Sequence, residues 1–259
     1  MSAFSVDTTH TAGLAEIVAS LPLSLSPVGD GPAQLAAVAG SPGWAQRAME
    51  AADGGALAVV VGSPQTDDGV AALASETAPR VVLAWDFAAN PGVLAAADAA
   101  APLRESAVLA EATLAVPSGT DLDAALLDVL VAVDRVAGEP ASLRSLHRGA
   151  NSWHLAGGTR SGAPLALSLV VTDAASASLR LRILTDDGGL TAVVPSPDTA
   201  APAEIRVVAR DGERLLPTLW ETSRRASWRR AVAIAAGDTI SGDIAELHRL
   251  TPLAAAALG

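Results

Sequence analysis

The first part of the chain alternates short apolar runs with alanine-rich segments of helical periodicity. Its clearest apolar run, Ala56–Val61, is continuous and is followed by Gly62-Ser63-Pro64, which is typical of a parallel strand covered on both faces. Further strands are predicted at Ala3–Val6, Leu23–Val28, Val81–Trp85 and Val108–Val116, and helices at Thr11–Leu21, Gly43–Ala52, Asp67–Thr77 and Pro91–Ala100, with a short helix or turn at Pro32–Ala39. This alternation predicts a doubly wound parallel sheet of the Rossmann-like type.

The pattern changes after a long amphipathic helix, which is predicted at Asp121–Ala137 and ends at Gly138. The segments that follow alternate apolar and polar residues with period two, and Asp186–Gly189 predicts a hairpin turn. The predicted strands are Ser142–Arg148, Ser152–Ala156, Pro164–Val171, Ser178–Leu184, Leu190–Val194, Glu204–Ala209 and Arg214–Leu219, and two helices follow at Thr222–Ala236 and Gly242–Leu258. Because long crossovers are missing, this second sheet is predicted to be mostly antiparallel.

We therefore expect an α/β plus α+β protein with two domains. A Rossmann-like domain would cover residues 1–120, and an α+β domain with the open sheet would cover residues 121–259. The last two helices are free to pack back on the first domain.

Composition narrows the function classes. The 259 residues carry a formal net charge of −11, so we expect neither a nucleic-acid nor a membrane-surface partner. No run reaches roughly 18 apolar residues, and the first residues lack the features of a secretory signal. We therefore expect a cytoplasmic protein.

Three absent residue types exclude specific chemistry. The chain has no Cys, which rules out disulfides, thiolate catalysis and cysteine-ligated zinc. All 17 basic residues are Arg, and Tyr is absent too. Schiff-base chemistry, Lys acid–base catalysis and the Tyr/Lys pair of short-chain dehydrogenases therefore have no residues to perform them.

Two segments carry a family resemblance. Ala56–Pro64 is ALAVVVGSP, and Leu126–Pro140 is LLDVLVAVDRVAGEP. Together with the order of elements, they resemble the third strand and the interdomain helix of the glucose–fructose oxidoreductase and inositol dehydrogenase (Gfo/Idh/MocA) family. The resemblance implies an NAD(P)-dependent oxidoreductase fold with a small-molecule ligand, and a homo-oligomer formed through the C-terminal sheet.

The same resemblance implies a divergent catalytic set. That family has Glu-Lys-Pro after its fourth strand, where this chain has Trp85-Asp86-Phe87, so Asp86 stands in the place of the Lys. The family's Asp and His, four residues apart on the interdomain helix, correspond to Ala124 and Asp128. Asp86 thus becomes a candidate catalytic residue of a different kind, or simply a cap for the following turn.

NAD or NADP is the cofactor class that the resemblance implies. A dinucleotide fingerprint needs several glycines in the first βα turn, and this turn has only Gly13. Candidate contacts in and after this turn are Asp7, Thr9, His10, Gly13 and Asp30, and the resemblance adds Ser63 and Pro64 beside the nicotinamide. Ordinary capped turns remain the alternative at Asp7 and Asp30.

His147 and His154 belong to the densest polar and aromatic cluster of the chain and are the remaining catalytic candidates. With the neighbouring Arg and Trp residues, they could line a pocket for an acidic or sugar-like ligand, or stand exposed at a domain edge. Their spacing of seven residues is poor for a metal site, and we expect none.

Three hypotheses of function stay open. The chain is a divergent member of this family without the usual Lys/Asp/His set, an active NAD(P)-dependent sugar or polyol oxidoreductase that uses a His acid/base, or a non-catalytic scaffold or partner subunit. Whether it is an enzyme, and for which substrate, does not follow from the sequence.

Overall fold

The computed structural model describes residues 3–7, 14–28, 32–73, 77–199 and 201–258. The chain forms two compact units, Met1–Trp85 with Ser223–His248, and Asp86–Thr222 with Arg249–Gly259. The expected domain boundary after residue 120 stays a prediction. Each unit is described separately.

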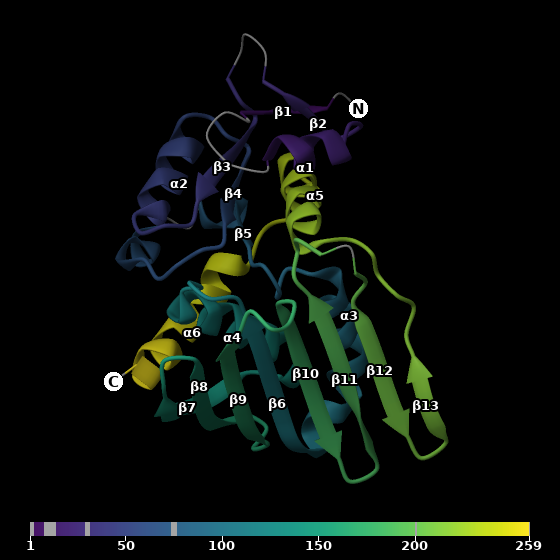
Figure 1. Ribbon diagram of the computed structural model, residues 1–259. Helices are drawn as coiled ribbons and strands as arrows, with labels where there is room; N and C mark the ends of the chain where they lie inside the picture. Colours follow the sequence, from purple (N-terminus) through teal and green to yellow (C-terminus); the bar gives the residue numbers. More distant parts are fainter. Residues whose placement is uncertain (1–2, 8–13, 29–31, 74–76, 200, 259) are drawn as a thin grey trace. The chain divides into compact units, whose positions relative to one another are not determined.

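The first unit contains a five-stranded parallel sheet, which confirms the predicted Rossmann-like class (Figure 1). Its strands are β1 (Phe4–Val6), β2 (Leu25–Pro27), β3 (Leu35–Ala39), β4 (Ala58–Gly62) and β5 (Val81–Ala84), in the spatial order β2-β1-β3-β4-β5. The chain leaves β1 toward β2 and then returns to place β3 on the other side of β1. The direction of winding therefore reverses between β1 and β3.

One prediction in this region was wrong. Pro32–Ala39 was expected to be a helix or turn, but Leu35–Ala39 forms β3, a central strand. Ala and Leu favour helices, but this segment pairs with β1 on one side and with β4 on the other. Its residues Leu35 and Val38 are buried. Burial in the sheet outweighs the helix propensity of five residues.

Helices cover both faces of this sheet. Helices α1 (Leu14–Ser20) and α5 (Ser223–Ala235) share one apolar cluster with Val60 and Val82. Val59 and Val61 point the other way, toward the side on which α2 (Trp44–Asp53) contacts β3 and β4.

The crossover from β4 to β5 differs from the expected helix at Asp67–Thr77. Its described residues form only two 3₁₀ turns, η1 (Asp68–Ala72) and η2 (Ala78–Arg80). The Asp67 carboxylate accepts a hydrogen bond from the Gly69 amide at 2.8 Å, which favours the tight turn. Because α5 already packs on β4 and β5, this crossover does not have to supply a covering helix.

The second unit is built on an eight-stranded sheet, ordered β13-β12-β11-β10-β6-β9-β8-β7 (Figure 1). Its elements are α3 (Pro91–Ala100), η3 (Ala101–Ser106), β6 (Ala107–Val116), α4 (Leu122–Ala137), β7 (Pro140–Arg148), β8 (Ser152–Thr159), β9 (Pro164–Val171), β10 (Ser178–Thr185), β11 (Gly188–Pro195), β12 (Glu204–Ala209) and β13 (Gly212–Leu215). Helix α6 (Asp243–Leu258) begins in the first unit and ends in the second. Of the strand pairs in this sheet, only β6 and β9 run parallel.

Strand β6 is a second correction. The sequence pattern placed Val108–Val116 in the parallel sheet, but it lies in the middle of the antiparallel one. Its burial alternates with period two, because Ala112 and Leu114 are buried whereas Thr113 is exposed. A strand of the parallel sheet would be buried on both faces, as β4 and β5 are.

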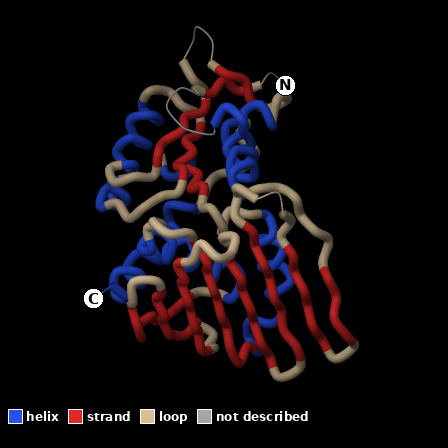
Figure 2. The backbone as a smooth tube through the Cα atoms, viewed as in Figure 1, coloured by secondary structure: helices blue, strands red, loops and turns tan. Residues whose placement is uncertain are grey.

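One face of the eight-stranded sheet is covered and the other is open. Helices α3 and α4 contact the sheet on the covered face, where Leu167, Leu169 and Leu181 are fully buried. Figure 2 shows these strands in red, with blue helices on one side. Alternate residues, such as Ser168 and Arg180, face the open side.

Gly40 lies at the end of β3, where the backbone after β4 approaches it closely. Its carbonyl accepts from the Gln65 amide at 2.8 Å, and an added Cβ would lie 2.5 Å from the Ser63 carbonyl oxygen. We expect Gly40→Ala to lower the free energy of unfolding by about 2–3 kcal/mol through this overlap. Urea denaturation is the measurement.

Gly242→Ala is the matched control, since an added Cβ there meets no atom within 4 Å. Equal stability of the two variants would contradict the close strand approach at Gly40.

Candidate functional site

The turn after β3 is held by a side chain of α2, the helix that follows it. The Arg47 guanidinium on α2 donates to the carbonyls of Ala39, Ser41 and Pro42 at 2.9, 2.7 and 3.2 Å. The turn continues into α2 through Gly43, whose φ of 83° is readily adopted only by glycine.

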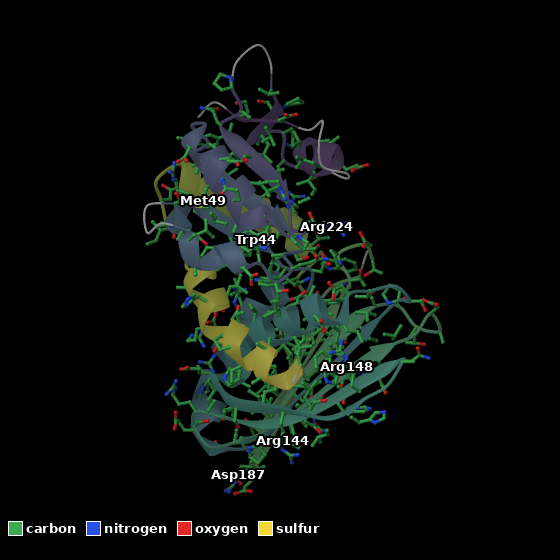
Figure 3. The ribbon with its side chains drawn as sticks, turned by 90° about the vertical axis from the view of Figure 1, so that its left-hand side faces the viewer. Trp44, Met49, Arg144, Arg148, Asp187 and Arg224 are labelled. Carbon is green, nitrogen blue, oxygen red and sulfur yellow. The ribbon has the colours of Figure 1, made fainter. Side chains whose placement is uncertain are left out.

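The N-terminus of α2 already has an acidic partner. Asp67 accepts from the Ala45 amide at 3.4 Å, and Trp44, labelled in Figure 3 at the start of α2, donates its indole N–H to the Gln65 carbonyl at 2.9 Å. A phosphate at this helix end would meet the charge of Asp67. The turn is therefore a structural joint rather than an anion site.

Ser63, at the carboxyl end of β4, has a φ of 47°, and it is the one non-glycine residue with positive φ in the described ranges. Its amide donates to the Ala84 carbonyl of β5 at 3.2 Å. Such backbone conformations cost energy and cluster at functional sites. Ser63 and Pro64 thus lie at the edge where the resemblance places them, and their contact with a cofactor stays a prediction.

A pocket of about 280 Å³ lies in the first unit where the winding of the sheet reverses. Small residues form most of its wall, and Asp7, the residue after β1, is its one charged lining residue. The lining residues are Asp7, Pro32, Ala33, Ala36, Ala37, Ala51, Gly54 and Ala56. Ligands of open α/β sheets bind at such reversal points outside the carboxyl ends of the strands. Asp7 follows the carboxyl end of β1, whereas Ala51, Gly54 and Ala56 lie toward the amino ends of β3 and β4.

The pocket includes only part of the predicted cofactor set. Asp7 lines it, but Thr9, His10, Gly13 and Asp30 lie outside the residues that the structure describes.

In the second unit, Asp128 of α4 is buried, with 6% of its surface exposed. Its two carboxylate oxygens accept from the amides of Phe87 and Ala88, at 2.9 and 2.7 Å. Arg135, two turns later, donates to the Ala88 carbonyl at 2.9 Å. Two side chains of α4 thus hold the loop after β5 through backbone groups of that loop.

The pKa of Asp128 is raised from its ordinary value of 3.8 to about 7, chiefly by burial and also by the negative charge of Asp86. The amides of Ala88 and Phe87 and the charge of Arg135 act in the opposite direction. Near neutral pH, Asp128 therefore exchanges a proton while it holds the loop. Its neighbour in this electrostatic pair is Asp86, the first sequence candidate.

Sequence reasoning compared Asp128 only with the His of the family and did not select it as a site residue. A signal was present, because Asp128 stands between Leu127 and Val129 inside a strongly apolar stretch. An acid in such a stretch becomes buried when the whole helix is covered, as here, where both neighbours are fully buried.

The two histidines come together across neighbouring strands. His147 of β7 pairs with His154 of β8, and their rings stack with centroids 6.2 Å apart at 27°. Nδ1 of His154 lies 3.0 Å from the Ser168 hydroxyl.

His154 and the buried Trp153 point to opposite faces of the sheet. The histidines therefore occupy the open face, whereas Asp128 projects from α4 on the covered face. The predicted catalytic residues do not converge, because the sheet separates the histidine pair from the carboxyl pair of Asp86 and Asp128.

Arg148, the polar neighbour of His147, lies on the covered face of the sheet. Arg148 lies over the Trp153 ring, 4.2 Å from its centroid, and donates to Asp123 at 2.9 Å. Arg148 therefore lies on the face of the sheet opposite to His147.

Arg230 of α5 forms a salt bridge within the first unit, because it donates to the buried Asp243 at 2.6 Å. The other oxygen of Asp243 accepts from the Leu83 amide of β5 at 2.8 Å. This pair fixes the start of α6 to the parallel sheet.

Within the described residues, no helix has the length and apolar character needed to cross a membrane. Within the same ranges, no three His, Cys, Asp or Glu side chains gather in a way that could hold a metal ion.

No protein-family model and no curated protein sequence matches the chain. Solved structures do resemble it over almost its whole length. Levoglucosan dehydrogenase in complex with NADH and levoglucosan is 14% identical, covers 99% of this chain and 87% of its own, and gives a TM-score of 0.69.

Two further structures give the same result. UDP-N-acetylglucosamine 3-dehydrogenase from Acidithiobacillus ferrooxidans is 18% identical over 99% of this chain and 88% of its own, with a TM-score of 0.65. A 3-ketoreductase from Actinomadura kijaniata in complex with TDP-benzene and NADP is 14% identical over 98% and 95%, with a TM-score of 0.68. The chain has the fold of these NAD(P)-dependent oxidoreductases.

The raised pKa of Asp128 predicts an unusual pH dependence of stability. The folded protein keeps this proton up to about pH 7, whereas the unfolded chain releases it near pH 4. Stability from this group is therefore full below about pH 4 and is lost as pH rises toward 7, by up to about 4 kcal/mol. Asp128→Asn, which cannot ionise, should abolish this part of the pH dependence.

Chemical denaturation between pH 4 and 8 measures the effect. Asp98→Asn on α3, an exposed acid, is the control and should follow the native profile. If Asp128→Asn also follows it, the carboxyl does not titrate in this range.

Proposed function

We propose that the chain is a divergent member of the Gfo/Idh/MocA family that binds a dinucleotide but lacks the residues used for hydride transfer. The observation that carries this proposal is the carboxyl pair after β5. Asp86 occupies the place where the resemblance expects Lys, and Asp128, buried behind the same loop, occupies the place where it expects His.

The chemical reason is the charge at this loop. Oxidation of an alcohol requires a group that takes the hydroxyl proton and a positive environment for the oxygen that loses it. Asp86 adds negative charge, and the oxygens of Asp128 are engaged with the Phe87 and Ala88 amides. With no Lys anywhere in the sequence, we infer that ordinary alcohol oxidation does not occur at this loop.

The pocket at the β1–β3 reversal fits one part of a dinucleotide. A volume of about 280 Å³ walled by alanines suits an adenine ring or a ribose rather than a whole dinucleotide. The carboxylate of Asp7 would accept hydrogen bonds from ribose hydroxyls and would repel a phosphate on the same sugar. A bound nicotinamide would supply a hydride acceptor or donor.

An active dehydrogenase that uses a His acid/base has less support than the present proposal, because His147 and His154 lie on the open face of the sheet. The similar enzymes have NADH with levoglucosan, or NADP with TDP-benzene, in their structures. We propose a sugar-like small molecule as the ligand class here.

We also propose a homo-oligomer formed through the open face. Cross-strand pairs such as Arg182 with Glu111, 3.3 Å apart, give this face an alternating charge pattern. A monomeric mass by light scattering would overturn this part, and it would leave the dinucleotide proposal intact.

Dinucleotide titration by calorimetry tests the proposal. We expect NADH to bind more tightly than NADPH, by about tenfold, because one added repulsion by Asp7 corresponds to roughly 1.4 kcal/mol. Asp7→Asn should remove most of this preference. Ala33→Leu should weaken both ligands, because it narrows the pocket without lying in a strand.

Ala166→Leu, on the exposed side of β9 in the other unit, is the control for added bulk. Absence of binding by the native chain would overturn the dinucleotide proposal. Undiminished binding by Ala33→Leu would place the ligand elsewhere.

A further inference from the structure

We propose that His147 and His154 form a two-ligand site for a borderline divalent cation of the Zn²⁺, Ni²⁺ or Cu²⁺ type. The spacing of seven residues along the chain predicted no metal site. The register of β7 and β8 changes this, because it places the two imidazoles directly opposite each other. This site is independent of the proposed dinucleotide binding.

The ring geometry suits a shared ion. A metal lies about 2 Å from each ligating nitrogen, so two imidazoles that share one tetrahedral metal have centroids about 5 Å apart. The observed centroid distance is 6.2 Å, and the planes of the stacked rings differ by 27°. A rotation of the exposed His147 side chain has to bring its ring about 1 Å closer and turn one of its nitrogens toward the same point as a nitrogen of His154.

The hydrogen bond of His154 suits a metal ligand. Its Nδ1 is engaged with the Ser168 hydroxyl at 3.0 Å, which orients the ring and leaves Nε2 for the metal. Metal-bound histidines commonly have such a partner on the second ring nitrogen. Ser168 belongs to the next strand, β9, so three adjacent strands build the arrangement.

His147 has the room to adjust. It is exposed, and the turn after β7 has Gly149, where a Cβ would come within 3.1 Å of its Nε2. The missing side chain keeps that side of the ring open. Both histidines lie on the open face, on the edge strand β7 and its neighbour β8, where a cation reaches them from solvent in the single chain.

The neighbours on this face determine which ions fit. The cross-strand row continues from His154 through Ser168 and Thr113 to Arg180. Hydroxyls therefore lie beside the pair, and the Arg180 strand is separated from His154 by two others. Two imidazoles with water as further ligands suit Zn²⁺, Ni²⁺ and Cu²⁺, whereas Mg²⁺ and Ca²⁺ prefer sets of oxygen ligands.

Calorimetric titration of the full chain with ZnCl₂, NiCl₂ and CuCl₂ tests the site. We expect one ion per chain, no binding of MgCl₂ or CaCl₂, and at least about tenfold weaker binding in His147→Ala and in His154→Ala. Ser168→Ala, which removes the orienting partner, should cost about tenfold. His248→Ala, an exposed histidine of α6, is the matched control and should bind like the native chain.

A spectroscopic readout separates the pair from other surface sites. Electron paramagnetic resonance of bound Cu²⁺ should show coupling to two imidazole nitrogens in the native chain and to one in either single variant. Unchanged circular dichroism without metal verifies that the variants fold. No binding by the native chain, or binding as tight as the native chain's in both histidine variants, would overturn the proposal.

Discussion

The position of the loop between β5 and α3 depends on the contact between the Asp128 carboxyl group and the amides of Phe87 and Ala88. This contact buries an acidic side chain of α4, and its pKa is raised to about 7. Two short amide hydrogen bonds and the nearby Arg135 offset part of the desolvation cost. In return, the backbone between β5 and α3 is fixed to α4. Asp86, whose charge bears on Asp128, belongs to the same loop.

The first unit is completed by a segment distant in sequence. The β4–β5 crossover supplies only 3₁₀ turns, and α5, more than a hundred residues later, packs on those strands instead. The Arg230–Asp243 pair and the Asp243 contact to Leu83 then attach the following helix to β5. The parallel sheet therefore depends on residues from both ends of the chain.

Much of the fold follows from the sequence because its periodicities are strong. The helix at Pro91–Ala100 was predicted with its observed bounds, since Asn90 caps it and Pro91 occupies its first turn. Predictions were wrong where packing decides the outcome. Leu35–Ala39 resembles a helix in composition and becomes a strand because two other strands enclose it, and β6 joins the second sheet because only one of its faces is apolar.

The site was less predictable for a similar reason. Asp86 was selected because the resemblance places the family's Lys at this position, but its partner Asp128 is defined by burial that only the packed helix creates. The pairing of His147 with His154 depends on hairpin register, including a shift between Ser145 and His147. A one-residue change of register would place the two rings on opposite faces. Sequence spacing alone does not contain this information.

The most direct test of the central claim is an assay of hydride transfer. The purified chain would be incubated with NAD or NADP and with levoglucosan, myo-inositol or UDP-N-acetylglucosamine, and formation of reduced cofactor would be followed by absorbance. A loop with Asp86 and Asp128 in place of a cation predicts no reduction above the protein-free rate. Reduction by the native chain that disappears in Asp86→Ala would contradict the account and establish an active dehydrogenase.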